Sequence, residues 1–338
     1  MFNNKCILVT GGTGFFGSNF VKCIFKKYKP KKVIVFSRDE SKQFDMQNEL
    51  CGKKYKGLKF FIGDVRDKER LLMAFDGVDY VVHAAALKHV PAAEYNPMEC
   101  IKTNIYGAEN IIQAAISCGV KKVIALSTDK AANPINIYGA TKLASDKLFV
   151  AANNLVGKKL TRFSVVRYGN VLSSRGSVIP FFYNLIKSGT KELPLTDIKM
   201  TRFVILIEEG IDFVFKSFER MSGGEIYVPK IPSIKILDLI KAIFPSKKYK
   251  IIGIRPGEKI HEILCPIDDN HLTYEYKDHF VIAPTIKFFT IKNNFKSNRI
   301  KEKGKIVQKG FEYQSGSNPK ILTISQIKKL LVKINDTI

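Results

Sequence analysis

The chain has 338 residues, 25% of them charged, and a formal net charge of +24 at pH 7. Its lysines are spread along the chain without a helix-turn-helix, zinc-finger or RNA-binding signature, so we expect the basic surface to attract anionic nucleotides rather than a nucleic-acid partner. No apolar run reaches about 18 residues, which argues against a membrane span, and no signal peptide leads the chain, so we expect a cytoplasmic protein. The cysteines and histidines lack the spacing of ligands, which argues against a disulfide framework and a metal site.

A glycine-rich loop lies directly after the first predicted strand. Residues 5–10 form a short apolar run, Thr10-Gly-Gly-Thr-Gly-Phe-Phe-Gly17 follows, and an apolar helix is expected over 15–28. Glycines let the backbone approach a pyrophosphate, and the helix N-terminus offers unpaired N–H groups. Strand, loop and helix in this order predict a dinucleotide-binding site. The expected cofactor contacts in this loop are Gly11, Thr13, Gly14, Phe15 and Gly17.

The second predicted strand, residues 33–36, ends in charged residues that bear on the type of dinucleotide. An acidic side chain at this place accepts the ribose 2′-hydroxyl of NAD, whereas an arginine suits the 2′-phosphate of NADP. Ser37 and Arg38 come first and Lys42 follows, which favours NADP. Asp39 keeps NAD open as the alternative.

Strands and helices alternate through the first half of the chain. Further strands are expected near 58–62, 79–83, 122–126 and 163–167, and helices near 98–118 and 137–153. This order is typical of an α/β fold with a doubly wound parallel sheet of the Rossmann type. The residues that follow the third and fourth strands should border the cofactor, and they are Asp64, Val65, Ala84 and Ala85.

The fifth predicted strand ends at the strongest chemical signal in the chain. It delivers Thr128, Asp129 and Lys130 to its carboxyl end, where open α/β sheets bind their ligands. Tyr138 and Lys142 are four residues apart at the start of the next helix and therefore share a face. The lysine should favour the tyrosine phenolate, which can take a proton from a sugar hydroxyl while hydride leaves for a nicotinamide. These five residues are the candidate catalytic groups.

The regular alternation breaks after Tyr168. We predict a dinucleotide-binding domain over 1–169, with returning segments near 203–230. The remainder, 170–338, is expected to form mainly a smaller nucleotide-sugar-binding domain and a C-terminal tail.

Two features of the C-terminal region stand apart from this division. A short amphipathic helix near 322–331, beginning at Thr323 or Ser325, is expected to dock on the body of the molecule. The segment 286–309 is rich in lysine, and its sequence suggests no function for it.

Six stretches, spread over nearly the whole chain, carry a resemblance to a known family. They are residues 85–97, 102–104, 126–147, 167–177, 200–203 and 255–262. Together with the glycine loop, they make the chain similar to the extended short-chain dehydrogenase/reductases and, more narrowly, to the inverting UDP-N-acetylglucosamine 4,6-dehydratases of pseudaminic acid biosynthesis. Val204 departs from that pattern, in which tryptophan is expected, and the chain has no tryptophan at all.

The resemblance implies a redox-neutral lyase that uses NADP. Hydride leaves C4 of the sugar for the cofactor, water is eliminated across C5 and C6, and hydride returns to C6, giving UDP-2-acetamido-2,6-dideoxy-β-L-arabino-hex-4-ulose. Asp129 is implied as the acid at C6 and Lys130 as the base at C5. Tyr138 and Lys142 are implied to act at C4, with Thr128 bonding the C4 oxygen. A lysine base must lose its proton first, so a desolvated site or a cationic neighbour should lower its pKa.

The resemblance also implies how the nucleotide sugar is held and how the chain assembles. Arg202 and Arg255 are implied to contact phosphates, Glu258 a ribose hydroxyl, and Lys88 both cofactor and substrate. The implied substrate contacts are Lys88, Asn170, Ser173, Arg175, Arg202, Arg255 and Glu258. A homo-oligomer, either a dimer or a hexamer, is implied as well.

Two other kinds of function remain open. The nearer is a UDP-sugar 4-epimerase or a C5-retaining 4,6-dehydratase of the same fold. An epimerase has no need of the pair Asp129 and Lys130 at C5 and C6, and retaining dehydratases typically carry Asp-Glu in place of this Asp-Lys pair. The more distant alternative is a basic scaffold that binds nucleic acid, which would show salt-sensitive affinity and hold no nicotinamide.

Overall fold

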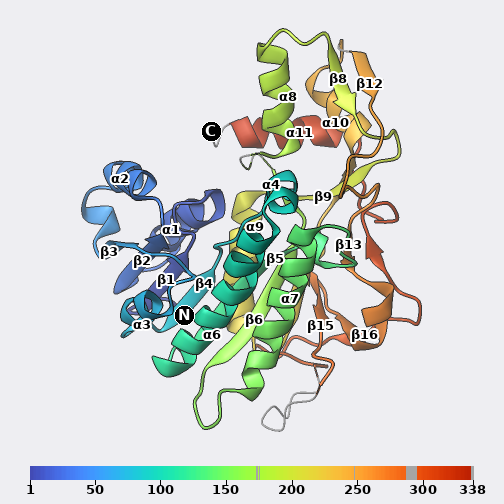
Figure 1. The fold of residues 1–338 in the computed structure, drawn as a ribbon. Helices are drawn as coiled ribbons and strands as arrows, with labels where there is room; N and C mark the ends of the chain where they lie inside the picture. The colour runs from blue at the N-terminus through green and yellow to red at the C-terminus, as the bar shows by residue number, and fades with distance from the viewer. Residues whose placement is uncertain (173, 175, 247, 287–294, 336–338) are drawn as a thin grey trace.

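The short β-branched runs of the sequence form the centre of the molecule, a ten-stranded sheet in the order β16-β14-β15-β10-β6-β5-β4-β1-β2-β3 (Figure 1). The computed structural model describes residues 1–172, 174, 176–246, 248–286 and 295–335. Seven strands run parallel: β1 (Cys6–Thr10), β2 (Lys32–Ser37), β3 (Leu58–Ile62), β4 (Tyr80–His83), β5 (Lys122–Thr128), β6 (Arg162–Tyr168) and β10 (Ile226–Pro229). The predicted α/β fold with a doubly wound parallel sheet is confirmed.

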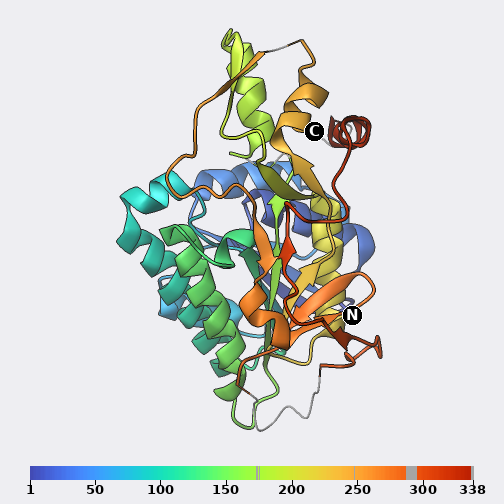
Figure 2. The same ribbon diagram turned by 90° about the vertical axis from the view of Figure 1, so that its right-hand side faces the viewer.

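Helices cover both faces of this sheet, as Figures 1 and 2 show from two sides. One face carries α1 (Phe15–Lys27) and α9 (Ile207–Arg220), which pack against each other. The other carries α6 (Gly107–Ser117) and α7 (Ile137–Ala151), with α3 (Lys68–Phe75) beside α6. The central strands are buried on both faces, which explains why they read as continuous apolar runs in the sequence.

The helix expected over 98–118 is interrupted. It consists of α5 (Pro97–Ile101), a π-helical turn (Lys102–Tyr106) and α6. Short π-helical turns inside helices commonly mark functional sites, and this one carries Asn104, whose side chain bonds to the loop that follows β4. The other two predicted helices of the first half match α1 and α7 to within two residues.

The second half of the chain contributes to the large sheet more than the sequence indicated. After β10 come three antiparallel strands at the edge: β14 (Thr273–Glu275), β15 (His279–Ile282) and β16 (Lys305–Ile306). The sequence-based division had placed these residues in the substrate-binding domain. Of the lysine-rich segment 286–309, residues 287–294 lie outside the described residues, and β16 belongs to the remainder.

The smaller part of the molecule lies beyond the carboxyl ends of the parallel strands (Figure 1). Its strands form three small sheets: β7 (Asn170–Val171) with β9 (Thr201–Ile205) and β11 (Ser233–Lys235), β8 (Glu192–Leu195) with β12 (Lys248–Ile251), and β13 (Ile263–Cys265) with β17 (Tyr313–Gln314). Its helices are α8 (Val178–Lys187), α10 (Ile236–Ile243) and α11 (Ile324–Asn335).

The C-terminal helix docks on the body, as predicted. Thr323 precedes α11, and its hydroxyl accepts a hydrogen bond from the amide of Gln326, which is the geometry of an N-terminal cap. Ile327 packs in a buried apolar cluster together with Val204, the position where the sequence pattern expects tryptophan. α10 lies against α11 in the same cluster.

Within the described residues, no helix is both long enough and apolar enough to cross a membrane. The same residues contain no cluster of histidine, cysteine, aspartate and glutamate that could hold a metal ion. All six cysteines are free thiols.

Candidate active site

The carboxyl ends of the parallel strands open into a cleft of about 620 Å³. This is the place where open α/β sheets bind ligands. Every residue that the sequence marked for the cofactor lines it: Gly11, Thr13, Gly14, Phe15, Gly17, Ser37, Arg38, Lys42, Asp64, Val65, Ala84, Ala85, Lys88, Tyr138 and Lys142. Thr128, Asp129 and Lys130 line the same cleft. The structure therefore joins the glycine loop and the candidate catalytic residues in one site.

The glycine loop leaves no room for a Cβ atom at Gly11 or Gly17. Gly11 has a φ of +64°, and a Cβ at this position would lie 2.9 Å from the backbone of Ala85. A Cβ on Gly17 would lie 2.5 Å from the carbonyl oxygen of Gly11. Helix α1 begins immediately after Gly14, so its free N–H groups face the cleft. This geometry fits the pyrophosphate of a dinucleotide.

The charged residues at the end of β2 form a helix cap and ion pairs. The carboxylate of Asp39 caps helix α2 (Glu40–Glu49) by accepting a hydrogen bond from the amide of Lys42 at 3.0 Å, and it also pairs with the Lys42 ammonium. Arg38 lies 3.6 Å from Asp64, with half of its side chain exposed. Arg38, Asp39 and Lys42 all line the cleft, so this end of it carries two cations and one carboxylate.

The turn after β4 is fixed by a buried threonine–histidine pair. The hydroxyl of Thr10 lies 2.8 Å from Nδ1 of His83 and accepts hydrogen bonds from the amides of Ala84 and Ala85. Burial lowers the pKa of His83 to about 3, with a smaller contribution from the charge of Lys142, so the imidazole stays neutral. These bonds hold β1 and β4 together where the cofactor would cross them.

Asn104, on the π-helical turn, anchors the next part of the same loop. Its side chain accepts from the amide of Leu87 at 2.9 Å and donates to the Leu87 carbonyl at 3.0 Å. It also donates to the hydroxyl of Thr141 on α7 at 3.0 Å. The loop that presents Lys88 to the cleft is thereby tied to the helix that carries Tyr138. The sequence analysis missed this role, although Asn104 lies within one of the stretches that carry the resemblance.

The end of β5 brings an acid and an amine into contact. Asp129 is 1% exposed and lies in a short 3-10 turn (Asp129–Ala131). Its Oδ1 accepts hydrogen bonds from the hydroxyl of Thr128 at 3.0 Å and from Nζ of Lys130 at 3.1 Å. Burial raises the pKa of Asp129, and the charge of Glu262 raises it further, against the opposing effect of Lys130. Asp129 therefore binds a proton more readily than an exposed aspartate.

Tyr138 and Lys142 lie on the buried side of α7, whose first turn is capped by Asn136. Burial raises the pKa of Tyr138 to about 12, against the opposing effects of Lys130 and of a hydrogen bond with Thr128. Among the main influences on Tyr138, the cation that favours the phenolate is Lys130, so the favouring of the phenolate by Lys142 stays a prediction. Burial lowers the pKa of Lys142 itself.

The expected lowering of the pKa of Lys130 is wrong. Burial alone would lower it, but the carboxylates of Asp129 and Glu262 outweigh burial and raise the pKa above the ordinary lysine value. Glu262 Oε1 lies 3.3 Å from Nζ of Lys130 and 3.6 Å from Nε of Arg202. The two cations reverse the effect of burial and lower the pKa of Glu262, which stays charged.

Two members of this charge cluster were missed in the sequence analysis. Glu262 is 2% exposed and immediately precedes β13, while Lys259 donates from Nζ to the carbonyl of Ala132 at 2.7 Å. Both lie in the stretch 255–262, which the resemblance had marked as a whole. No spacing rule connects that stretch to Lys130, so only its position within a matched stretch could have drawn attention to it.

Only some of the implied substrate contacts lie in the cleft. Lys88 and Asn170 line the cleft, whereas Ser173 and Arg175 lie outside the described residues. Arg202 donates to the carbonyls of Thr201 and Ile260 and faces Glu262. Arg255 and Glu258 pair with each other, at 3.0 Å between Nε and Oε2, and Glu258 also accepts from Thr196. None of Arg202, Arg255 and Glu258 lines the cleft of the described structure.

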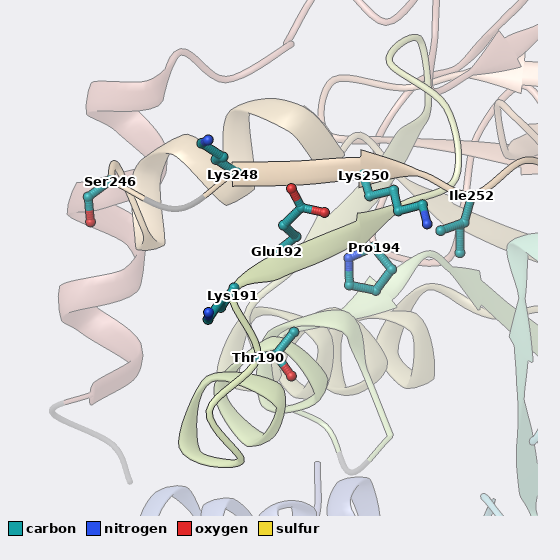
Figure 3. Close-up of a pocket in the computed structure, with 8 residues that line it drawn as sticks. All are labelled: Thr190, Lys191, Glu192, Pro194, Ser246, Lys248, Lys250 and Ile252. Carbon is teal, nitrogen blue, oxygen red and sulfur yellow. The ribbon is translucent and has the colours of Figure 1, made fainter.

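A second hollow, of about 780 Å³, lies in the smaller part of the molecule (Figure 3). It is bordered by the pair of strands β8 and β12 and shares no residue with the cleft. Its lining residues are Thr190, Lys191, Glu192, Pro194, Ser246, Lys248, Lys250 and Ile252. It contains none of the candidate catalytic or cofactor residues, so the chemistry belongs to the cleft at the strand ends.

The chain has close relatives over its full length. The model of a family described as polysaccharide biosynthesis protein matches residues 7–284. Over 340 residues the chain is 60% identical to a UDP-N-acetylglucosamine 4,6-dehydratase (inverting) of Campylobacter jejuni subsp. jejuni serotype O:2, covering 100% of this chain and 99% of the relative. It is 42% identical over 342 residues to a UDP-glucose 4-epimerase of Rickettsia akari, covering 99% and 97% of the two chains.

Solved structures repeat the fold. Pen from Bacillus thuringiensis matches with a TM-score of 0.87 and 35% identity, over 99% of both chains. DesIV, a dTDP-glucose 4,6-dehydratase from Streptomyces venezuelae with NAD and TYD bound, matches with a TM-score of 0.65 over 75% of this chain and 86% of its own. At 23% identity, the second likeness shows the fold alone.

Proposed function

The chain belongs to the polysaccharide biosynthesis protein family of extended short-chain dehydrogenase/reductases, and we propose that it is a UDP-N-acetylglucosamine 4,6-dehydratase that inverts C5 of the sugar. The observation that carries this proposal is the pair formed by Asp129 and Lys130, 3.1 Å apart, at the strand ends beside Tyr138. A carboxyl group next to an amine supplies the acid and the base that elimination of water requires. The 60% identity to an inverting dehydratase supports the same assignment.

The pair can reach its reactive state by moving one proton. In the structure Lys130 is held as an ammonium, and the raised pKa of Asp129 makes its carboxylate the acceptor for one of the ammonium protons. Transfer from Nζ to Oδ1 gives a neutral amine and a neutral acid without changing the net charge of the pair. The amine then removes the proton from C5, and the acid protonates the C6 hydroxyl, which leaves as water. Among the described residues, the buried Oδ2 of Asp129 has no hydrogen-bond partner, and we propose that the substrate supplies one when it binds.

Tyr138 acts on the C4 hydroxyl in this proposal, with Thr128 bonding the C4 oxygen and Lys142 beside them. A bound nicotinamide supplies a hydride acceptor for C4 and a hydride donor for C6. Since Tyr138 has a pKa of about 12 in the structure, the phenolate is the minor form at neutral pH, and the activity should increase as the pH rises. Inversion then requires that C5 receive a proton that comes from water, on the face opposite to Lys130, while the proton taken by Lys130 restores its ammonium.

We propose NADP as the cofactor. The glycine loop, in which a Cβ on Gly11 or Gly17 would meet backbone atoms, fits a dinucleotide. Ser37, Arg38 and Lys42 line the cleft as donors for a 2′-phosphate, and the carboxylate of Asp39 pairs with Lys42. The nucleotide recovered from the purified protein tests this proposal. NADP is expected, and recovery of NAD alone would contradict it.

The remaining parts of the proposal concern substrate contacts, assembly and setting. Lys88 and Asn170 are proposed to contact the nucleotide sugar from inside the cleft, and Arg202, Arg255, Glu258, Ser173 and Arg175 from the smaller domain. The division into 1–169 and 170–338 stays a prediction. We further propose a homo-oligomer located in the cytoplasm that acts at the start of pseudaminic acid biosynthesis.

Proton NMR of the purified protein with UDP-N-acetylglucosamine in D₂O, without added reductant, tests the function. A new C6 methyl signal, deuterium at C5 and couplings of the L-arabino configuration are the expected result. A methyl signal with the original C5 configuration would assign a retaining dehydratase. The absence of any conversion with the cofactor present would contradict the proposed substrate.

A 4-epimerase is the second candidate, because the chain is 42% identical to a relative named UDP-glucose 4-epimerase. The same NMR experiment separates the two functions. An epimerase would interconvert the gluco and galacto forms without forming a methyl group, and Lys130 would then be dispensable.

A further inference from the structure

Glu262 is buried beside the amine proposed as the catalytic base, although it lies far from Lys130 in the sequence. Its Oε1 is 3.3 Å from Nζ of Lys130, and the side chain is 3% exposed. Oδ1 of Asp129 lies 3.1 Å from the same Nζ. The ammonium of Lys130 therefore lies between two buried carboxylates, only one of which is needed to protonate a leaving hydroxyl.

The carboxylate of Glu262 is not needed to hold its own backbone in place. Its amide donates to the hydroxyl of Ser315, and its carbonyl accepts from the amide of Ser315, next to the β13–β17 pair. These bonds involve main-chain atoms of Glu262 and survive a change of its side chain. Its second carboxylate oxygen, Oε2, has no hydrogen-bond partner among the described residues. The side chain is thus directed at the charge cluster and not at the local fold.

The charged groups around this carboxylate come from several elements. Lys130 faces it from the turn after β5, Arg202 from β9 and Lys259 from the preceding loop. Lys130 is in turn faced by Asp129, Arg202 and Tyr138, the last from α7. With three cations around it, Glu262 stays ionised. At 3.3 Å from Nζ, its Oε1 is placed to accept a hydrogen bond from Lys130 whether that side chain is an ammonium or an amine.

We propose that Glu262 is a positioning residue for the elimination step: it holds the Lys130 amine at the cleft by accepting one of its N–H bonds while Asp129 carries the transferred proton. This inference rests on the proposed function, in which Lys130 is the base at C5. A neutral amine keeps two N–H donors and one lone pair. With one N–H bonded to Glu262, rotation about the Cε–Nζ bond is restricted, and the lone pair can face the substrate instead of solvent.

The experiment measures kcat and KM for the 6-deoxy product as a function of pH in wild type, Glu262→Ala and Glu262→Gln. Glu262→Ala removes the acceptor and is expected to lower kcat about a hundredfold, the usual cost of a misplaced catalytic group, with KM changed less than about threefold. Glu262→Gln keeps an acceptor oxygen without the charge, so its best kcat should stay within about tenfold of wild type. Because the charge of Glu262 raises the pKa of both Asp129 and Lys130, its loss should move the acid limb of the kcat profile, where the pair gains a proton, to lower pH by about one pH unit or more.

Glu225→Gln is the matched control. Glu225 is also 2% exposed, accepts from the hydroxyl of Ser164 and the amides of Ser222 and Gly223, and does not line the cleft. It should lower the thermal stability without moving the pH profile. If Glu262→Gln behaves in the same way, with an unmoved acid limb, the positioning role is overturned and a structural role replaces it. If Glu262→Ala does not fold, the pH position of the acid limb of kcat in Glu262→Gln decides by itself whether Glu262 positions Lys130.

The two proposals fail in different ways. If wild type forms no 6-deoxy sugar, the proposed function falls. If wild type forms it and both Glu262 variants match wild type in kcat and in pH profile, the function stands and the role of Glu262 falls.

Discussion

Lys130 illustrates at the scale of single residues how neighbours decide chemistry. Burial without partners would favour the amine that a base needs, but Asp129 and Glu262 supply two negative charges within 3.3 Å and stabilise the ammonium. The carboxyl of Asp129 experiences the opposite balance, because burial and Glu262 both raise its pKa. The adjacent pair therefore contains a proton donor, the ammonium of Lys130, and a proton acceptor, the carboxylate of Asp129.

Substituting Lys130→Ala should stop elimination and leave oxidation at C4 possible. We expect the rate of 6-deoxy product formation to fall by about 10²- to 10⁴-fold, the usual contribution of a general base. Product NMR measures this rate, and the absorbance of reduced cofactor reports the C4 step. Lys122→Ala is the control, because Lys122 is a half-buried lysine that donates to the Phe218 carbonyl away from the cleft. A Lys130→Ala enzyme with the full product rate would refute the assignment of the base.

His83 should make the stability of the fold depend on pH. Its pKa is lowered to about 3 in the folded protein, from the ordinary value of 6.5, mainly by burial. A lowered pKa means that the stabilisation is present above pH 6.5 and is lost as the pH falls towards about 3, because the unfolded chain binds the proton first. By pH 5 the loss from this group should be about 2 kcal/mol.

Urea unfolding of wild type and His83→Gln at pH 7 and pH 5 measures this dependence. Glutamine can replace the hydrogen bond to Thr10 but does not titrate, so the variant should lose about 2 kcal/mol less than wild type over this interval. Equal losses in the two proteins would show that His83 is not the group responsible.

At the scale of elements, the site depends on the close approach of the β1–α1 loop to the first turn of α1 and to the residues that follow β4. A Cβ on Gly17 would meet Gly11 and Gly12 backbone atoms at 2.5 to 2.6 Å, and one on Gly11 would meet Ala85 at 2.9 Å. Backbone atoms cannot move aside as a flexible side chain can. The glycines are therefore required by the contact between the elements, as well as by the proposed contact with the cofactor.

Gly17→Ala should widen the loop and weaken cofactor binding. We expect the affinity for NADP, measured by calorimetry on protein freed of nucleotide, to fall at least about tenfold, since the displaced N–H groups no longer reach the pyrophosphate. Gly210→Ala is the control, because a Cβ there meets only the end of the Ile205 side chain at 3.8 Å. That variant lies inside α9 and should be neutral or slightly stabilising. Unchanged NADP affinity in Gly17→Ala would contradict the proposed loop contact.

At the scale of the whole molecule, the net charge of +24 surrounds a cleft proposed to bind two anionic nucleotides. Fields of this kind raise the association rate of anions and are screened by salt. At the edge of the large sheet, ion pairs also stabilise the fold. Arg220, 2% exposed, pairs with Asp278 and with Glu302 of the lysine-rich segment, which joins that segment to α9.

The electrostatic attraction predicts a salt dependence of turnover at low substrate concentration. Raising the ionic strength from about 0.01 M to about 0.15 M shortens the screening length from about 30 Å to about 8 Å. We expect kcat/KM for UDP-N-acetylglucosamine to fall by about tenfold over this range, while kcat changes little. Initial rates at several salt concentrations measure both quantities, and a constant kcat/KM would contradict the steering.

The sequence by itself determined the parallel sheet and which of its residues line the cleft at the strand ends. Apolar runs bounded by glycines specify strands locally, and parallel strands bring their carboxyl ends to one edge, so residues such as Gly11, Arg38 and Ala85 had to meet there. The pair of Asp129 and Lys130 was visible for the same reason, because adjacent residues at a strand end share a site. These properties follow from short-range pattern and chain order.

Only the tertiary structure decided which charges surround Asp129 and Lys130, the proposed catalytic pair. Glu262 reaches Lys130 because β13 lies against the 3-10 turn that follows β5, and Arg202 of β9 pairs with the same carboxylate. No local pattern in the sequence encodes that packing. The direction of a pKa depends on the sum of burial and all nearby charges, which is why the sequence predicted a lowered value for Lys130 and the structure shows a raised one. Protonation is a property of the assembled site, whereas the order of strands is a property of the chain.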